Sequence, residues 1–174
     1  LVKGAITKKI IHQNPNDRDD YKEINTLTIG APVGEKASAV MIAKDKILFI
    51  GGQQKGEGYA ASNEAIIIDI SDSFNPKIEK RESMHYPRAN ADATILPTGD
   101  IFVNGGTAIY QGAYDDTYFS NFTPEIYKTN DDIWKKMSKT NFRRNYHSTS
   151  LLLPDGRIFV AGGDVWNAQF FYPP

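Results

Sequence analysis

A hairpin pattern that occurs three times is the feature that most restricts what this chain can fold into. Residues 37–53, 91–107 and 148–164 align without a gap, each with an apolar run, a turn, a second apolar run and a Gly-Gly pair. The second glycines of the pairs are Gly52, Gly106 and Gly163, so the repeats are spaced by 54 and 57 residues. Short apolar runs on either side of a turn predict antiparallel hairpins, and their repetition predicts a chain built from similar units.

The turns and glycine pairs predict the local geometry of each hairpin. The turns read Lys44-Asp45, Pro97-Thr98-Gly99 and Pro154-Asp155-Gly156. In the third turn, proline presets φ, aspartate offers a side-chain cap and glycine supplies a left-handed position. The Gly-Gly pair after each second strand predicts a place where the backbone bends or packs closely against a neighbour.

A period near 50 residues with Gly-Gly after the second strand resembles the kelch repeat, which has about four strands per propeller blade. Residues 66–68, 125–127 and 169–171 each begin another strand, and Tyr127 and Trp134 have the tyrosine-to-tryptophan spacing of a kelch unit. We therefore expect an all-β fold, a kelch-type β-propeller with about three blades of an incomplete ring of seven. Unrelated hairpins in a β-sandwich are the alternative, which three ungapped matches make a poor explanation.

The expected organisation has two parts. Residues 1–31 match the repeat poorly and are predicted to hold the end of a preceding blade and a polar surface loop at residues 12–22. Residues 32–174 hold three kelch-like units, at about 36–84, 85–137 and 138–174, the last one truncated. Three units cannot close a ring, so missing blades or a partner chain are expected to complete it, and the piece alone is expected to be unstable.

Composition excludes several classes of function. The chain has 20 basic and 21 acidic residues and no basic stripe, so nucleic acid is not an expected partner. The pair Arg143-Arg144 is interpreted as solvated surface. No apolar run approaches a membrane span, and the absence of cysteine excludes disulfides and thiolate metal ligands within the chain.

Tyr146 and His147 are the leading candidates for chemistry, because both side chains can bind a metal or move a proton. In the other units their places are taken by Ala89-Asn90 and Glu35-Lys36, so the pair is unique to the third unit. Residues that the fold requires should recur in each repeat, whereas functional ones need not. The residues leave two alternatives open: a metal or catalytic site, or a buried, hydrogen-bonded structural pair.

Residues 108–122 form an aromatic-rich connection in which Tyr110 and Tyr114 are candidate substrate-binding residues. Aromatic rings can line a mouth that binds a sugar or alcohol, and packing between blades is the equally open alternative. His85 is interpreted as a hydrogen-bonded structural histidine.

Residues 144–157, followed by Gly162-Gly163, resemble the copper-ligand segment of galactose oxidase and the glyoxal oxidases. Residues 122–127, 96–100, 39–41 and 46–48 are similar to the same family in order and spacing. The likeness covers about residues 31–174, which would correspond to the later blades of the catalytic propeller.

The resemblance implies a secreted copper radical oxidase that oxidises a primary alcohol or an aldehyde with O2 and releases H2O2. It implies that Tyr146 is the axial copper ligand and the base that takes the alcohol proton, and that His147 is an equatorial ligand. The radical tyrosine, its cysteine and a second histidine would lie outside this chain, so the chain alone is expected to be inactive.

Ala89-Asn90 replaces an aromatic-histidine pair of galactose oxidase, which leaves the substrate open among small alcohols, aldehydes and carbohydrates. The rival hypothesis is a non-catalytic kelch propeller that binds a protein or a glycan.

Overall fold

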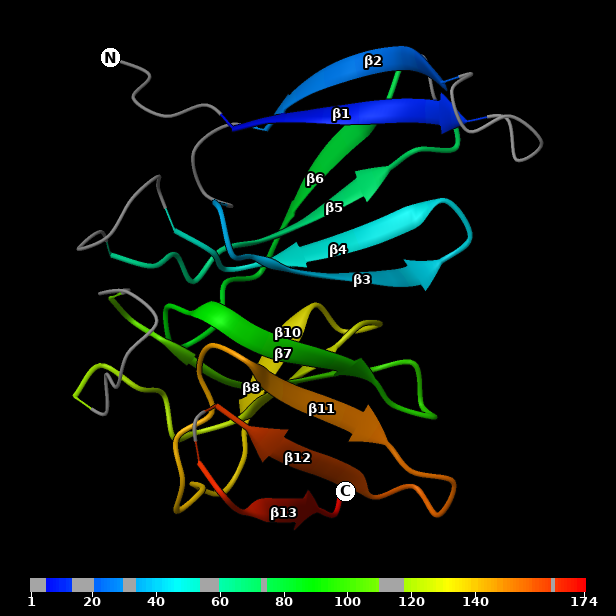
Figure 1. Ribbon diagram of the computed structural model, residues 1–174. Coiled ribbons are helices and arrows are strands. Elements are labelled where there is room, and N and C mark those ends of the chain that lie inside the picture. The colour runs from blue at the N-terminus through cyan, green and yellow to red at the C-terminus, as the bar shows by residue number, and fades with distance from the viewer. Residues whose placement is uncertain are drawn as a thin grey trace.

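The computed structural model describes residues 6–13, 21–29, 34–53, 60–72, 75–109, 118–163 and 165–174. Within them the chain forms strands and turns only (Figure 1). The strands are β1 (Ile6–Gln13), β2 (Tyr21–Ile29), β3 (Ser38–Ala43), β4 (Lys46–Ile50), β5 (Ala65–Asp69), β6 (Lys77–Arg81), β7 (Ala89–Ile95), β8 (Ile101–Thr107), β9 (Glu125–Lys128), β10 (Ile133–Lys136), β11 (Ser148–Leu152), β12 (Ile158–Gly162) and β13 (Ala168–Phe171).

The strands form antiparallel sheets in which sequence neighbours are also neighbours in space. The sheet orders are β1-β2, β3-β4-β5-β6, β7-β8-β9-β10 and β11-β12-β13. We call the last three sheets the first, second and third units. Their first strands, β3, β7 and β11, lie side by side at the front of Figure 1, and β7 contacts both of the others. The prediction of an all-β fold is confirmed, and the stacked meanders have a propeller-like arrangement.

The units pack face to face through rows of paired residues. In the first unit Val40, Leu48 and Ile67 pair across the strands and are buried. Thr94, Phe102 and Ile126 occupy the same row in the second unit and are also buried, the last two in a cluster with Ile158 and Val160 of the third unit. One face of each of these two sheets is therefore covered by the unit that follows it.

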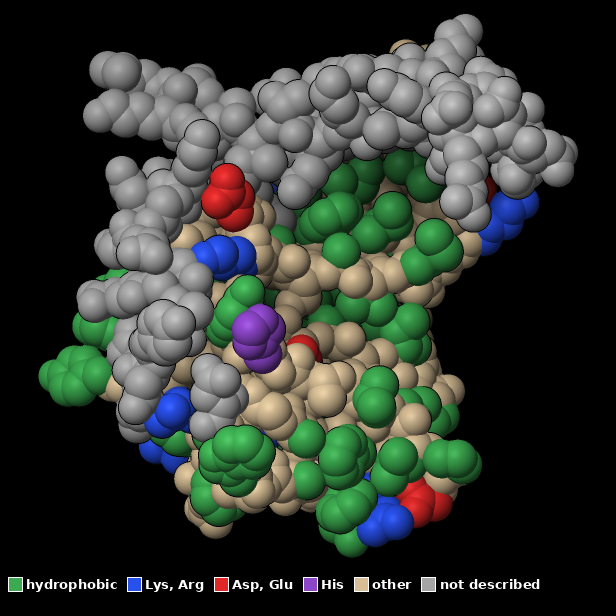
Figure 2. Space-filling model, viewed as in Figure 1, with side chains coloured by type: hydrophobic (Ala, Val, Ile, Leu, Met, Phe, Trp, Pro, Cys, Tyr) green, Lys and Arg blue, Asp and Glu red, His purple; other side chains and the backbone are tan. Residues whose placement is uncertain are grey.

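The corresponding row of the third unit is open to solvent. Leu151 pairs with Phe159, which pairs with Phe170. Leu151 is 54% exposed and Phe170 is 48% exposed, while the guanidinium carbon of Arg157 lies 4.8 Å from the ring centre of Phe170. Figure 2 shows apolar side chains gathered over the lower part of the molecule, where this sheet lies. The row has the composition of a packing surface without the sheet that would cover it.

The Gly-Gly pairs lie where backbone segments approach closely, as the sequence predicted, and the first two pairs lie at contacts between units. Both glycines of every pair have positive φ, between 64° and 89°. The amide of Gly52 donates to the carbonyl of Arg88 at 2.7 Å, and the amide of Gly106 donates to the carbonyl of Arg144, also at 2.7 Å. The first and second pairs thus bind the chain at the start of the next unit, whereas the third packs against residues 144–148 of its own unit.

Gly105 tests this packing most directly. A Cβ atom there would lie 1.9 Å from the carbonyl oxygen of Arg144, whereas a Cβ at Gly99, which also has positive φ, would meet nothing within 4 Å. Gly105→Ala is therefore expected to lower the free energy of unfolding by about 2–3 kcal/mol more than Gly99→Ala, because only the first adds a steric clash to the backbone strain. Urea denaturation of the complete protein would measure both; equal losses would contradict the packing role.

Tyr127 and Trp134, the kelch-like pair, are partners in the β9-β10 register with ring centres 4.9 Å apart. The Tyr127 hydroxyl donates to Asp132 at 2.6 Å and accepts from Nε of Arg81 at 2.9 Å. The indole of Trp134 donates to the carbonyl of Glu82 at 2.7 Å. Burial raises the pKa of Tyr127 to about 12, and the pair joins the second unit to the end of the first.

The first hairpin differs from the prediction. β1 extends to Gln13 and β2 begins at Tyr21, so the predicted loop at residues 12–22 is shorter at both ends, and β2 was not predicted at all. The run Thr26-Leu27-Thr28-Ile29 is β-branched at three of its four positions, which favours a strand even though no hairpin repeat marks it.

No helix in the described part of the chain is long and apolar enough to cross a membrane.

Candidate functional site

The site is built where the chain enters the first strand of each unit. Lys36 and His147 lie just before β3 and β11, Asn90 is the second residue of β7, and all three have positive φ, at 61°, 63° and 56°. Residues other than glycine rarely adopt this conformation, and it is costlier for large side chains. The three units therefore share a left-handed residue at this entrance, and only the third places a histidine there.

The third unit also has one more residue than the second between its buried arginine and its residue of positive φ. Arg88 donates through Nη1 to the carbonyl of Gly105 at 2.6 Å, and Arg144 donates in the same way to Gly162 at 2.9 Å. The two glycines are equivalent, but the arginines lie 17 and 18 residues before them. The extra residue between Arg144 and His147 makes room for a second aromatic side chain before the strand.

Arg144 corrects one prediction. The pair Arg143-Arg144 was interpreted as solvated surface, yet Arg144 is only 1% exposed. Its second guanidinium nitrogen donates to the carbonyl and side-chain oxygens of Asn167 at 3.1 and 2.9 Å. Because backbone and amide oxygens replace its water, the charge can be buried without a direct carboxylate partner.

Tyr146 and His147 stack on each other at this entrance. Their ring centres are 3.7 Å apart and the rings are inclined by 35°. Tyr146 is half-buried and His147 is exposed. Neither the phenol nor the imidazole has a hydrogen-bond partner among the described residues. The structural alternative predicts a buried, hydrogen-bonded pair, whereas only Tyr146 is partly buried and neither ring is hydrogen-bonded to the described residues.

A cavity of about 250 Å³ opens beside His147, and all three units contribute to it. Its lining consists of Lys36, Ala37, Asn90, Ala91, Asp92, Asn145, His147 and Ser148. Figure 2 shows a histidine beside an acidic side chain at the junction of the sheets. Ser148 begins β11, the first strand of the third unit, as the sequence predicted.

Side-chain hydroxyls hold the first strands together below this cavity. Ser38 donates to the carbonyl of Ala91, and Ser148 donates to Oδ2 of Asp92 at 2.5 Å. Burial raises the pKa of the Asp92 carboxyl to about 6, although the bond from Ser148 and the positive charge of Arg144 act in the opposite direction. A carboxylate is thereby fixed beside the residue that follows His147.

Phenol and imidazole together suit copper, because a neutral imidazole nitrogen is a good copper ligand and a phenol oxygen adds a second donor of a different kind. Neither donor at this entrance forms a hydrogen bond with the described residues, so neither would have to break one of these to bind a metal. Across the described ranges, no group of three or more His, Asp or Glu side chains could hold a metal by itself. The phenol and the imidazole at this entrance therefore fit part of a copper ligand set.

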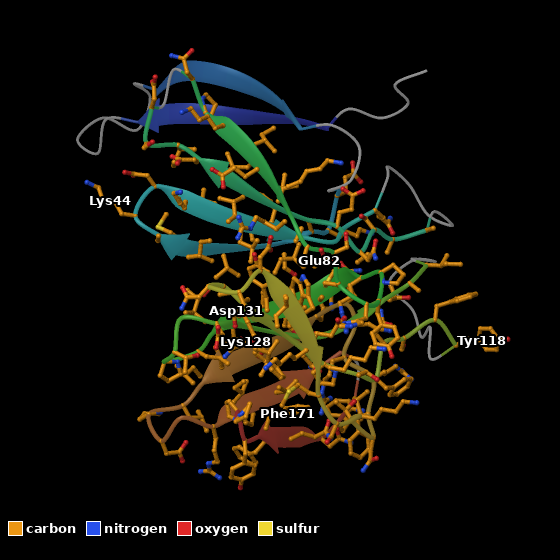
Figure 3. All side chains as sticks on the ribbon, turned by 180° about the vertical axis from the view of Figure 1, so that it is seen from behind. Lys44, Glu82, Tyr118, Lys128, Asp131 and Phe171 are labelled. Carbon is orange, nitrogen blue, oxygen red and sulfur yellow. The ribbon has the colours of Figure 1, made fainter. Side chains whose placement is uncertain are left out.

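The structure describes only part of the aromatic-rich connection at residues 108–122. Tyr110 and Tyr114 lie outside the described residues. Tyr118, from the same connection, is 90% exposed and projects away from the sheets in Figure 3, with its ring 5.1 Å from that of Phe119. His85 is hydrogen-bonded as predicted, its Nδ1 lying 2.7 Å from Glu125 Oε2.

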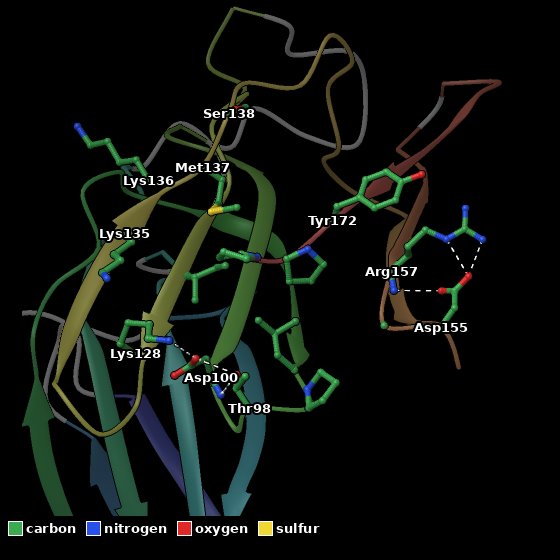
Figure 4. A pocket seen from close by; sticks show the side chains of 16 residues that line it. Thr98, Asp100, Lys128, Lys135, Lys136, Met137, Ser138, Asp155, Arg157 and Tyr172 are labelled. Carbon is green, nitrogen blue, oxygen red and sulfur yellow. Dashed lines mark hydrogen bonds and ion pairs between the residues drawn. The ribbon is translucent and has the colours of Figure 1, made fainter.

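A larger cavity of about 870 Å³ lies between the outer parts of the second and third units (Figure 4). Leu96, Ile126 and Met137 form part of its apolar wall. Four of its charged residues form two ion pairs, Lys128 with Asp100 at 2.5 Å and Arg157 with Asp155 at 2.6 Å. Neither Tyr146 nor His147 is part of its lining.

Asp92 and the two buried arginines were missed in the sequence. Asp92 could have been found, because the ungapped alignment places it opposite Ser38 and Thr149, one carboxylate where the other repeats have hydroxyls. The equivalence of Arg88 and Arg144 was not visible in the sequence. The third unit has one extra residue after its arginine, so the two arginines do not align without a gap.

Comparisons with known proteins identify several oxidases that this chain is similar to. Residues 41–173 match the family model described as glyoxal oxidase N-terminus. A galactose oxidase of Gibberella zeae is 33% identical over 155 residues, which is 82% of this chain and 22% of that protein. The aldehyde oxidase GLOX of Vitis pseudoreticulata is 36% identical over 95 residues, covering 52% of this chain and 17% of its own length.

A solved structure has the same fold. It is described as a novel fungal alcohol oxidase with catalytic diversity among the AA5 family, in complex with copper. The two structures superpose with a TM-score of 0.75 and 26% identity, covering 86% of this chain and 34% of that one. The chain thus spans about a fifth of the length of the curated relatives.

Proposed function

The chain belongs to the glyoxal oxidase N-terminal family, and from this premise we propose that it is part of a copper-dependent oxidase of primary alcohols or aldehydes. The observation that carries the proposal is the stacked Tyr146-His147 pair, in which His147 lines a cavity and neither ring has a hydrogen-bond partner among the described residues. The relatives named above, a galactose oxidase and an aldehyde oxidase, support the same class of reaction.

The overall reaction is a two-electron oxidation. A primary alcohol loses two protons, one from the hydroxyl and one from the adjacent carbon, together with two electrons, and O2 takes up two electrons and two protons to become H2O2. An aldehyde reacts through its hydrate, which loses the same atoms and gives the acid. The substrates proposed are small alcohols, aldehydes or carbohydrates.

Copper, one ion, would supply electron transfer and a Lewis-acid centre when bound. This chain would contribute Tyr146 Oη and a ring nitrogen of His147 as ligands. Tyr146 Oη would also accept the hydroxyl proton of the substrate, as a general base placed within reach of that hydroxyl. The stacking contact between the two rings would hold both side chains at the cavity entrance.

The rest of the site would come from outside this chain. We propose that the row formed by Leu151, Phe159 and Phe170 is covered by a further sheet, as the equivalent rows of the first two units are. The units at 36–84, 85–137 and 138–174 would then be kelch-type blades of a seven-bladed ring, with residues 1–31 ending a preceding blade. The 174 residues alone would be inactive, and the complete protein extracellular.

The test is to purify the complete protein, measure its copper by mass spectrometry and follow H2O2 release with a primary alcohol and with an aldehyde. We expect one bound copper and substrate-dependent peroxide. His147→Ala should lower copper affinity by at least about tenfold, as loss of a first ligand is expected to weaken the site no less than loss of an outer contact does.

His85→Ala is the matched control, because it removes a histidine that bonds to Glu125 instead of facing the cavity. It should leave copper content unchanged. A complete protein that binds no copper and releases no peroxide would favour the rival function, a kelch module that binds a protein or glycan.

A further inference from the structure

Asp92 lines the cavity, and the proposed reaction gives it no role. It lies on β7, in the second unit, and lines the cavity together with His147 of the third unit and Lys36 of the first. One of its oxygens, Oδ2, is bound by the Ser148 hydroxyl at 2.5 Å. The other, Oδ1, has no hydrogen-bond donor among the described residues. The cavity therefore contains a fixed acceptor that the fold leaves available.

Two amide side chains nearby are also unpartnered. Nδ2 of Asn90, which lines the same cavity, is buried and has no hydrogen-bond partner. Asn104 pairs with Asp92 across the β7-β8 ladder, is only 1% exposed, and has no partner for either side-chain atom. Buried polar groups without partners are uncommon in folded proteins, and each one costs free energy unless a ligand or water satisfies it. Of the two, Asn90 lines the cavity beside Asp92, where a polar ligand could satisfy it.

We propose that Asp92 and Asn90 form a hydroxyl-binding pair that selects neutral, hydroxyl-bearing substrates over anionic ones. Oδ1 of Asp92 would accept a hydrogen bond from a substrate hydroxyl, and Nδ2 of Asn90 would donate one to a substrate oxygen. A carboxylate on the substrate can donate nothing to Asp92 and is repelled by its charge. This inference rests on the proposed function, and it makes Asp92 a specificity-determining residue of that reaction.

The charges around the cavity are consistent with this role. Arg144 acts on Asp92 electrostatically, and Lys36 adds a second cation to the lining. With Asp92 ionised, the negative charge nearest the ligand offsets these cations. Without it, the cations would favour an anionic ligand. The raised pKa of Asp92, about 6, still leaves the carboxyl ionised at pH 8.

The experiment compares glycolaldehyde with glyoxylate at pH 8, using the complete copper-loaded protein. The two aldehydes are similar in size and differ in a hydroxymethyl against a carboxylate group. Asp92→Asn retains an oxygen that can accept from Ser148 and removes the charge. We expect the ratio of kcat/KM values, glycolaldehyde over glyoxylate, to fall about tenfold, which corresponds to 1.4 kcal/mol.

A second variant should change the ratio in the opposite direction. Asn90→Asp adds a carboxylate to the same cavity, and aspartate tolerates the positive φ at this position better than most residues do. Relative to the unaltered protein, it should raise the ratio of kcat/KM for glycolaldehyde over glyoxylate and lower kcat/KM for glyoxylate. Asp100→Asn is the matched control, because it removes a buried carboxylate that bonds to Thr98 and Lys128, outside the lining of this cavity.

Binding gives a readout that does not depend on turnover. Acetate, an unreactive anion, should bind the Asp92→Asn protein about tenfold more tightly than the unaltered protein in titration calorimetry. If all variants had the same kcat/KM ratio and the same acetate affinity, the inference would be overturned. The proposed function would be unaffected, provided that the protein still released peroxide. Absence of peroxide with both aldehydes would instead refute the proposed function itself.

Discussion

Tyr146→Phe is expected to lower kcat for substrate-dependent peroxide release by about two to four orders of magnitude, the usual effect of losing a general base. The substitution removes one oxygen and keeps the ring, so the stacking contact with His147 is retained. Because the phenol has no hydrogen-bond partner in the described protein, phenylalanine leaves no buried group unpaired. Copper should remain bound through the other ligands.

The measurement is steady-state peroxide release by the complete protein, with copper content determined on the same sample. Tyr118→Phe is the matched control, because Tyr118 is 90% exposed and projects from the sheets (Figure 3). It should keep the original kcat. Unchanged turnover in the Tyr146→Phe protein would remove Tyr146 from the reaction, and lost copper together with lost folding would assign it a structural role.

Glu125→Gln is expected to lower the free energy of unfolding of the complete protein by about 3–5 kcal/mol. Glu125 and Arg88 are completely buried, with Arg88 Nη2 at 3.0 Å from Glu125 Oε1. The carboxylate also accepts from the amides of His85 and Tyr86 and from the His85 ring. Glutamine keeps the shape but removes the charge, and its amide group faces donors where an acceptor is required.

The cost is large because Arg88 would keep its charge in a buried site. Burial already lowers the pKa of the Arg88 guanidinium, and the charge of Glu125 is the main effect that opposes this. Urea denaturation followed by tryptophan fluorescence would measure the loss, because Trp134 packs against Tyr127 in the same unit. Glu79→Gln is the control: its partner Arg81 is 3.9 Å away and it is 45% exposed, so a change within about 1 kcal/mol is expected. Similar losses in the two variants would show that the buried pair does not stabilise the unit.

Local chemistry explains why much of the fold could be predicted. The turn glycines Gly99 and Gly156 have φ of 84° and 85°, as a left-handed turn position requires. The three ungapped repeats led to the correct strands because apolar runs bounded by such turns have few alternatives to a hairpin. β2 was missed because its β-branched run belongs to no repeat, so only its local composition indicated a strand.

The candidate site could be predicted only in part. The uniqueness of Tyr146 and His147 among the repeats singled them out without any structure. The buried network was not predictable in the same way, because Arg144 looks like any basic surface residue until Asn167 and Gly162 are seen to surround it. Burial of a charge depends on which oxygens the rest of the chain brings to it, and these come from residues 18 and 23 positions away.

The repeated β-hairpins, their turns and the one unit with a Tyr-His pair could all be predicted from the sequence alone. These depend on φ preferences and apolar patterns, which act over a few residues and can be read locally. The sequence did not indicate that His147 lines a cavity shared by three units, or that Asp92 of another unit lines the same cavity; both follow from the tertiary structure. Such neighbours are set by how whole sheets stack, because the 56 residues that separate Asp92 from Ser148 are brought together by packing between units and not by any local preference.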